Sequence, residues 1–296
     1  MEEKAIRVEN VHKSYSSTVA LDGISFEVSK GSIHGFLGPN GAGKSTTMKI
    51  ITNELTLCSG EVFVDSNRPI GFLPEIPPLY KHMVVEEFLQ FVKNIFESQV
   101  DLSGILEKCG IDNVKGRLIG NLSKGYQQRV GIAQALIVDP EIIILDEPTV
   151  GLDPHAIKEI RELILSLKKD HTILFSTHQL YEASNLCDEV TIINRGKILK
   201  TGKIEDVKRD LVTGEIFLIE LDSRLSDEDC EECEKEFNVE IIRKETELRI
   251  TSKGNEDLRG RINRFLLDRN YIVSSLKIEE MDLEQIFEQV TSEKNV

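Results

Sequence analysis

The sequence predicts an α/β fold for most of the chain and a small α+β domain after about residue 210. Two apolar runs, at 142–145 and 172–175, are typical of strands buried on both faces of a parallel sheet. A glycine-rich loop at 38–46 lies between the apolar stretch "IHGFL" and a helix-like stretch, as in strand–loop–helix units of α/β folds. The later segments follow the order βαββαβ, which is a ferredoxin-like arrangement.

Two further subdomains are expected beside this core. Residues 5–33 alternate polar and apolar residues in short runs, which favours antiparallel strands joined by tight turns. Between about 75 and 135, the stretch "LSKGYQQRVGIAQAL" predicts a helix with Ser123 as its N-cap. A second amphipathic helix is predicted from "VVEEFLQFVKNIF", whose apolar stripe contains Val85, Phe88, Leu89, Val92 and Phe96. We therefore expect an antiparallel β subdomain and a helical subdomain.

Composition excludes several classes of function. The chain has 296 residues, 40% of them hydrophobic, and a formal net charge of -15. Such an acidic chain is a poor candidate for sequence-independent nucleic-acid binding, which needs Lys and Arg to neutralise phosphates. No apolar run approaches the ~20 residues that a membrane-spanning helix needs. The first residues, "MEEKAIRVENV", lack the apolar stretch of a signal peptide. We expect a cytoplasmic protein.

The five cysteines do not form an evident disulfide or metal framework. Their number is odd and their spacing is wide. Cys230 and Cys233 form a C-x-x-C pair, but a zinc site would need a second pair of ligands at suitable spacing. With Phe237 they fall at helical spacing in "SDEDCEECEKEF", where acidic residues occupy the other face. The pattern favours buried core thiols.

The loop "GPNGAGKST" at 38–46 has the pattern G-x-x-x-x-G-K-[ST] in its required strand–loop–helix context. Its glycines allow backbone N–H groups to surround a β-phosphate. Lys44 supplies a positive charge to the β- and γ-phosphates, and Ser45 offers a hydroxyl to Mg²⁺. This loop alone does not distinguish kinases, GTPases and ATPases.

Polar side chains follow two of the predicted buried strands. Asp146 and Glu147 end the first, and two carboxylates in this place are costly unless they serve a cation or a proton. Asp146 is a candidate ligand of Mg²⁺, and Glu147 a candidate general base toward attacking water. His178 follows the next strand at the sheet edge where ligands gather, within expected reach of a γ-phosphate.

These motifs together resemble the nucleotide-binding subunits of ATP-binding cassette (ABC) transporters. The match runs from residue 5 to about 210, which implies an ABC ATP-binding domain at 1–210, a helical subdomain at about 75–135, and a separate domain at 211–296. In family order the chain carries "GPNGAGKST" as Walker A, "GFLPE" at the Q-loop, "LSKGYQQR" as the signature, "EIIILDEP" as Walker B, "GLDP" as the D-loop, and the switch histidine.

The resemblance implies ATP as the ligand and Mg²⁺ as the cofactor. Glu147 and His178 become the catalytic residues, and Tyr15 matches the aromatic residue that stacks on adenine. The implied metal ligands are Ser45, Asp146 and Glu75. The implied ATP-binding residues are Tyr15, Gly38, Pro39, Asn40, Gly41, Ala42, Gly43, Lys44, Ser45 and Thr46, with Ser123 and Gly125 reaching the ATP of a partner subunit.

The signature explains why a glycine stands in the first turn of a helix. Gly125 weakens the helix, but a helix N-terminus attracts anions and a glycine lets one come close. In the family, two subunits face each other head to tail, so the resemblance implies a dimer, expected to be a homodimer. The chain departs from the usual LSGGQ at Lys124 and Tyr126, a variant similar to that of ATPases serving small export permeases. Glu75 stands where glutamine is usual.

The resemblance implies a peripheral protein on the inner face of the cell membrane that powers a separate transmembrane permease, expected to be an exporter. Tyr80 and its neighbours are candidates for the permease interface. The C-terminal extension is expected to have a docking or dimer-stabilising role and to end in a short helix at 282–290. Two alternatives stay open: a cassette ATPase acting in repair or on ribosomes without a permease, and a nucleotide-gated binding module.

Overall fold

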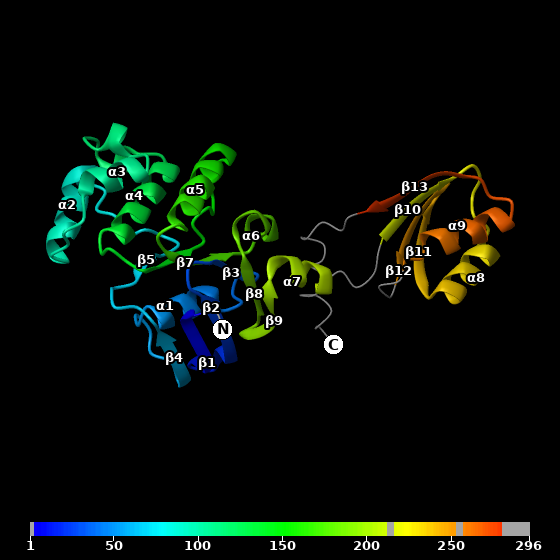
Figure 1. Ribbon diagram of the computed structural model, residues 1–296, viewed down its shortest axis with the longest axis horizontal. Helices are drawn as coiled ribbons and strands as arrows, with labels where there is room; N and C mark the ends of the chain where they lie inside the picture. The colour runs from blue at the N-terminus through cyan, green and yellow to red at the C-terminus, as the bar shows by residue number, and fades with distance from the viewer. Residues whose placement is uncertain (1–2, 212–215, 253–256, 280–296) are drawn as a thin grey trace. The chain divides into compact units, whose positions relative to one another are not determined.

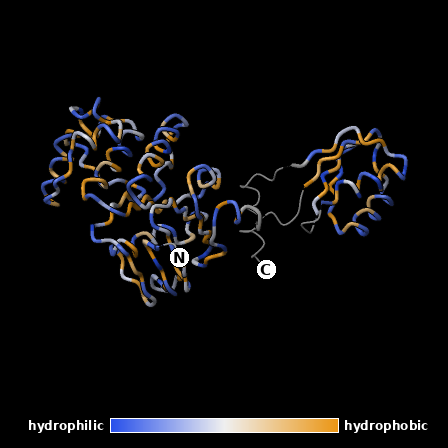
Figure 2. Tube along the Cα trace, viewed as in Figure 1, coloured by the Kyte–Doolittle hydropathy of each residue, from blue (hydrophilic) through white to orange (hydrophobic). Residues whose placement is uncertain are grey.

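A computed structural model describes residues 3–211, 216–252 and 257–279 of the chain (Figure 1). The chain forms two compact units, Met1–Ile204 and Glu205–Val296. In both units hydrophobic and hydrophilic residues alternate along the chain (Figure 2), so each unit can enclose a core of its own. The functional motifs of the sequence all lie in the first unit.

A six-stranded sheet forms the centre of the first unit. Its order is β5-β6-β7-β3-β8-β9; neighbouring strands are parallel except that β9 runs antiparallel to β8. Strands β6, β7 and β3 are buried throughout, and the apolar runs of β6 and β7 are typical of such strands. Because β6, β7 and β3 are parallel neighbours, the residues that follow them meet at one edge. The strands are β3 (Ile33–Leu37), β5 (Gly71–Leu73), β6 (Ile142–Asp146), β7 (Thr172–Thr177), β8 (Glu189–Asn194) and β9 (Lys197–Lys203).

A smaller antiparallel sheet and one helix cover one face of the central sheet (Figure 1). The small sheet has the order β2-β1-β4, which confirms the predicted antiparallel subdomain. Phe36, Ile144 and Leu174 from the central strands share a core with Met48 of the helix. The elements are β1 (Lys4–Tyr15), β2 (Thr18–Ser29), β4 (Ser59–Val64) and α1 (Lys44–Ile51).

Helices α4, α5 and α6 lie on the other side of the central sheet, and α2 and α3 pack beyond α4 (Figure 1). The predicted amphipathic stripe of α2 is buried at its first four positions, whereas Phe96, directly after the helix, is 55% exposed. The helix ends at Ile95, and Glu97 then adopts a φ of 49°, which turns the chain away. The bounds are α2 (Val85–Ile95), α3 (Leu102–Lys108), α4 (Lys124–Leu136), α5 (Pro154–Leu167), α6 (Leu180–Leu186) and α7 (Ile204–Leu211), with 3₁₀ turns at Asp112–Val114 and Ile119–Asn121.

The second unit has the predicted order βαββαβ. Its sheet order β11-β12-β10-β13, with antiparallel neighbours throughout, is that of a ferredoxin-like fold. The elements are β10 (Ile216–Leu221), α8 (Asp227–Phe237), β11 (Val239–Lys244), β12 (Glu247–Ser252), α9 (Arg259–Asp268) and β13 (Val273–Glu279). The helix predicted at 282–290 lies outside the described residues.

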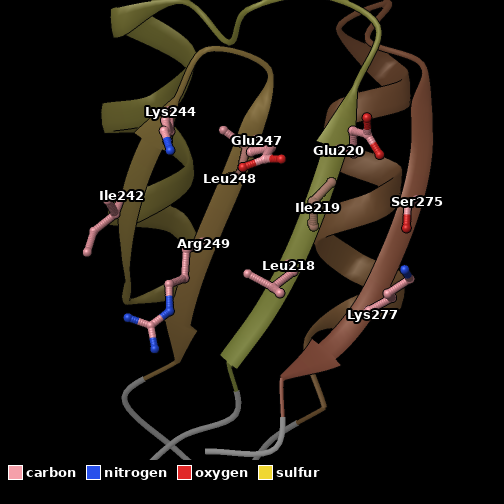
Figure 3. Close-up of a pocket in the computed structure, with 10 residues that line it drawn as sticks. All are labelled: Leu218, Ile219, Glu220, Ile242, Lys244, Glu247, Leu248, Arg249, Ser275 and Lys277. Atoms are coloured by element: carbon pink, nitrogen blue, oxygen red, sulfur yellow. The ribbon is translucent and has the colours of Figure 1, made fainter.

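The two faces of this sheet differ in chemistry. On the helix side, Cys230 and Cys233 are buried in the core with Phe237, which confirms that they are core thiols. Burial raises the pKa of Cys233 to about 12, so its thiol stays protonated at neutral pH. The other face lines a shallow pocket of about 370 Å³, where Leu218 stands between the side chains of Arg249 and Lys277 (Figure 3).

Candidate functional site

The glycine-rich loop opens into a pocket of about 420 Å³ in the first unit. Gly43, the N-cap of α1, has a φ of 112°, and a Cβ there would lie 2.7 Å from Leu21 Cδ2. Only glycine therefore fits at this turn, which directs the free N–H groups of α1 toward an anion site. The lining residues are Ala20, Asn40, Gly41, Gly43, Lys44, Ser45, Thr46, Glu75, Glu147 and Val150.

Lys44 is buried, with its ammonium group held by three oxygen atoms. It donates hydrogen bonds to the carbonyl oxygens of Gly38 at 2.8 Å and Pro39 at 3.2 Å. Its Nζ also lies 3.0 Å from Glu147 Oε1. Two of its three protons are therefore hydrogen-bonded within the loop, and the ion pair with Glu147 holds the group from outside the loop. An entering phosphate would replace Glu147 as the third partner.

Glu147 has an unusual backbone conformation at the end of β6. Its φ is 49°, in the left-handed region that non-glycine residues rarely adopt. Its N–H donates to Ser176 Oγ at 2.9 Å, and the same hydroxyl donates to Asp146 Oδ1 at 2.6 Å. Such strain is characteristic of functional sites, where the surrounding structure over-determines the conformation. Here Ser176 of β7 fixes both carboxylate residues of β6.

The two carboxylate oxygens of Glu147 have different surroundings. His178 Nδ1 lies 2.9 Å from Oε2, and because a carboxylate only accepts hydrogen bonds, this nitrogen donates. Oε1 is buried and has the ion pair with Lys44 but no aligned hydrogen bond. It therefore retains capacity to accept a proton or a hydrogen bond from a group in the pocket.

The structure gathers most, but not all, of the residues that the sequence predicts to act together. Asn40, Gly41, Gly43, Lys44, Ser45, Thr46, Glu75 and Glu147 line one pocket. Gly38 and Pro39 supply carbonyl groups to Lys44, while Asp146 and His178 contact the pocket residues through Ser176 and Glu147. Tyr15 is 48% exposed at the end of β1, with Lys13 over its ring, and does not line this pocket.

Ser123 and Gly125 also lie outside this pocket. Ser123 caps α4, and its side chain accepts a hydrogen bond from the N–H of Tyr126. A Cβ on Gly125 would lie 2.8 Å from Ala156 Cβ in α5, so glycine also permits the close packing of these helices. No residue pattern near Gly125 indicates this second reason.

Sequence reasoning missed a group of buried polar residues around the site. Glu182 accepts hydrogen bonds from Thr149 and Thr177, and Ser176 joins Asp146 to the backbone of Glu147. The polar run "STH" at the end of an otherwise apolar strand was the available signal, because polar residues at that edge of a sheet face the ligand region.

The residues present fit a nucleoside triphosphate with a divalent cation. The loop forms a cradle that a Cβ at Gly43 would fill, at the N-terminus of an eight-residue helix. The buried Glu147 Oε1 faces the pocket without an aligned hydrogen bond. Ser45 and Glu75 add a hydroxyl and a carboxylate, the oxygen ligands that Mg²⁺ prefers.

Comparison with known proteins agrees with this chemistry. Residues 21–150 match the protein family described as ABC transporter. An uncharacterized ABC transporter ATP-binding protein of Methanocaldococcus jannaschii is 41% identical over 212 residues, covering 70% of this chain and 80% of that protein. The lantibiotic transport ATP-binding protein SrtF of Streptococcus pyogenes is 38% identical, covering 66% of this chain and 89% of that protein.

A solved structure shares the fold. It is the ADP conformation of an ATP-binding cassette of an ABC transporter, with a TM-score of 0.61 and 29% identity. The likeness covers 70% of this chain and 94% of that one. In the described part of this chain, no helix has the length and apolar content needed to cross a bilayer.

Proposed function

The chain belongs to the ABC transporter family of ATP-binding subunits, and from this premise we propose that it powers an exporter whose membrane-spanning permease is a separate polypeptide. Its activity is the ATP hydrolysis of that family. The observation that carries the proposal is Glu147, held between Lys44 and His178 at the phosphate-loop pocket. The export direction is supported by the likeness to SrtF, a lantibiotic transport ATP-binding protein.

Lys44 controls the general base in this mechanism. When a phosphate enters the pocket, it takes the third position on the Lys44 ammonium group, and Glu147 Oε1 is released. That oxygen then accepts the proton of the attacking water. His178 holds Oε2, which orients the carboxylate and leaves its other oxygen toward the pocket.

We propose that Ser45, Asp146 and Glu75 hold Mg²⁺ beside the phosphates. The cation supplies charge neutralisation to the phosphoryl group. Ser45 and Glu75 line the same pocket, and Asp146 is fixed behind it by Ser176. Glu75 is exposed, whereas Asp146 is buried, so the two carboxylates differ in their access to solvent.

The variant Glu75→Gln should need a higher Mg²⁺ concentration for half-maximal hydrolysis, because glutamine offers an oxygen without a negative charge. The measurement is the rate of phosphate release at saturating ATP over a series of Mg²⁺ concentrations. Glu54→Gln, which replaces an exposed carboxylate that does not line the pocket, is the control. An unchanged Mg²⁺ dependence in Glu75→Gln would remove Glu75 from the metal site.

The stretch after Glu75 provides a surface suited to the permease. Ile76 is 82% exposed and Tyr80 is 55% exposed. The ring of Tyr80 packs 5.7 Å from that of Phe88 and 5.9 Å from that of Phe91, which is itself exposed on α2. Adjacent exposed aromatic and aliphatic groups are typical of protein interfaces. Tyr80 follows the pocket residue Glu75 by five positions. A permease docked here would therefore contact the chain segment that leads directly into the pocket.

The variant Tyr80→Glu should lose its association with membranes that contain the permease, since it buries a charge in an apolar contact. Basal ATP hydrolysis should be unchanged because Tyr80 does not line the nucleotide pocket. The measurement is the fraction of the protein that sediments with membranes of its own cell. Leu165→Glu, at an exposed apolar position on α5, is the matched control. Equal sedimentation of both variants and the wild type contradicts the proposed surface.

A second copy of the chain would complete the site. Ser123 and Gly125 lie at the start of α4, a helix of 13 residues, outside the pocket of their own molecule. We propose that they bind the γ-phosphate held by a second subunit, with the dimer on the cytoplasmic face of the membrane. Co-purification of a permease with the chain would support transport over a permease-free role, and hydrolysis would exclude a purely nucleotide-gated binding module.

A further inference from the structure

Glu182 is a fully buried carboxylate in the first turn of α6, outside the nucleotide pocket. Its Oε2 accepts a hydrogen bond from Thr149 Oγ1 at 2.8 Å and another from Thr177 Oγ1 at 2.9 Å. Its Oε1 lies 3.5 Å from Arg161 Nη2 on α5. A buried carboxylate is retained only where it is paired and hydrogen-bonded, so all these contacts act together.

The two threonines belong to the two loops that carry the reactive side chains. Thr149 lies two residues after Glu147, in the loop that follows β6. Thr177 ends β7 and directly precedes His178. The loops are about 30 residues apart in the chain, yet one oxygen atom of Glu182 joins them.

The bonds of Glu182 to the two threonines act on the hydrogen bond between His178 and Glu147, which needs accurate positioning. His178 Nδ1 must stay within hydrogen-bond distance of Glu147 Oε2, now 2.9 Å, while Glu147 keeps its left-handed backbone. Ser176 binds the backbone of Glu147, where the loop after β6 begins. Glu182 binds Thr149 in that loop and Thr177 at the end of β7. The Thr177 hydroxyl also accepts from the N–H of Gln179, which fixes the turn that carries His178.

We infer that Glu182 is a positioning residue, which holds the two loops in the register that keeps His178 on Glu147. Its contribution to hydrolysis rests on the proposed roles of those two residues. A glutamine in its place has one acceptor oxygen and one NH₂ group. Either the NH₂ faces the donors of Arg161, or it replaces the acceptor of the two threonines.

The test combines kinetics with a spectrum of His178. Glu182→Gln and Thr177→Val should lower kcat by about 10–100-fold, the usual effect of removing a group that orients an active-site residue. The dissociation constant for ATP should be unchanged, because neither side chain lines the pocket. In the nucleotide-free protein, the ¹⁵N resonance of His178 Nδ1 should shift toward that of a solvent-exposed imidazole. Glu189→Gln, which replaces a partly buried carboxylate bonded to His34, is the control and should change neither signal.

The outcomes separate this inference from the proposed function. An unchanged Nδ1 resonance in both variants would overturn the positioning role, whatever the effect on the rate. A shifted resonance with an unchanged kcat would support the positioning role and overturn the part of His178 and Glu147 in hydrolysis. If Glu182→Gln does not fold, Thr149→Val and Thr177→Val each remove one hydrogen bond to the carboxylate, which stays paired with Arg161, and Thr177→Val also removes the bond from Gln179. The double variant Glu182→Gln/Thr149→Val should be no slower than the slower single variant, since Thr149→Val removes a hydrogen bond of the same link.

Discussion

Glu147→Gln will slow ATP hydrolysis by about 10²–10⁴-fold, the usual contribution of a general base, while ATP binding is kept. The amide cannot take a proton from water at neutral pH. It also ends the ion pair with Lys44, whose ammonium group then faces the pocket without a competing carboxylate. ATP affinity should therefore equal or exceed that of the wild type. Single-turnover phosphate release and a nucleotide-binding titration measure the two effects; a rate close to wild type would exclude Glu147 as the base.

The same variant should form a dimer with ATP and not with ADP, because the retained γ-phosphate holds the start of α4 of a second subunit. Light scattering with each nucleotide measures this, at protein concentrations well above the micromolar range so that a weak dimer is populated. Introducing Gly125→Glu in the Glu147→Gln background should prevent the dimer, since like charges this close in a dry site cost several kcal/mol.

The packing of Gly125 against Ala156 requires a control for this experiment. Any side chain at 125 meets Ala156 Cβ, so Gly125→Glu alone could disturb α4 and α5 rather than the phosphate contact. In the Glu147→Gln background, Gly125→Ala/Ala156→Gly restores the space and should still dimerise with ATP. Gly125→Glu/Ala156→Gly should not. Loss of the dimer in both pairs would assign the glycine to helix packing alone.

Lys44→Ala should weaken ATP binding by about 10–100-fold, because the one position that its ammonium group offers a phosphate forms a charge-assisted hydrogen bond that contributes about 1.5–3 kcal/mol. Isothermal titration with ATP measures this loss. The variant also leaves the buried Glu147 carboxylate without its cation, which destabilises the fold by about 3–5 kcal/mol. The free energy of unfolding in urea should fall accordingly.

The double variant Lys44→Ala/Glu147→Gln separates the two effects. With the buried charge removed, the free energy of unfolding should return toward that of the wild type, while ATP binding should stay weak. If stability and ATP binding recover together, the weak binding of Lys44→Ala reflects a damaged fold, and Lys44 does not contact the phosphates.

The sequence by itself determined the features that depend on local pattern. Uninterrupted apolar runs identified β6 and β7, alternation identified the antiparallel strands, and the order βαββαβ identified the ferredoxin-like domain. The phosphate loop could be read from "GPNGAGKST" because its glycines and lysine act over nine consecutive residues. In each case, the residues that define the feature are neighbours in the chain or recur with a fixed period.

Only the tertiary structure decided what depends on side chains from distant segments. The ion pair of Lys44 with Glu147 joins residues about 100 positions apart, and no periodicity reports such a contact. The close packing that also requires glycine at 125 involves Ala156 of another helix. The sequence pattern around Glu182 is that of an ordinary helix, and only the fold brings two threonines from separate loops to its carboxylate. Phe96 lies on the apolar stripe of its helix by spacing alone, but the helix ends one residue before it. Local sequence fixes which face of an element is apolar, whereas the packing of elements against one another fixes which buried polar groups meet, and the candidate catalytic contacts depend on that packing.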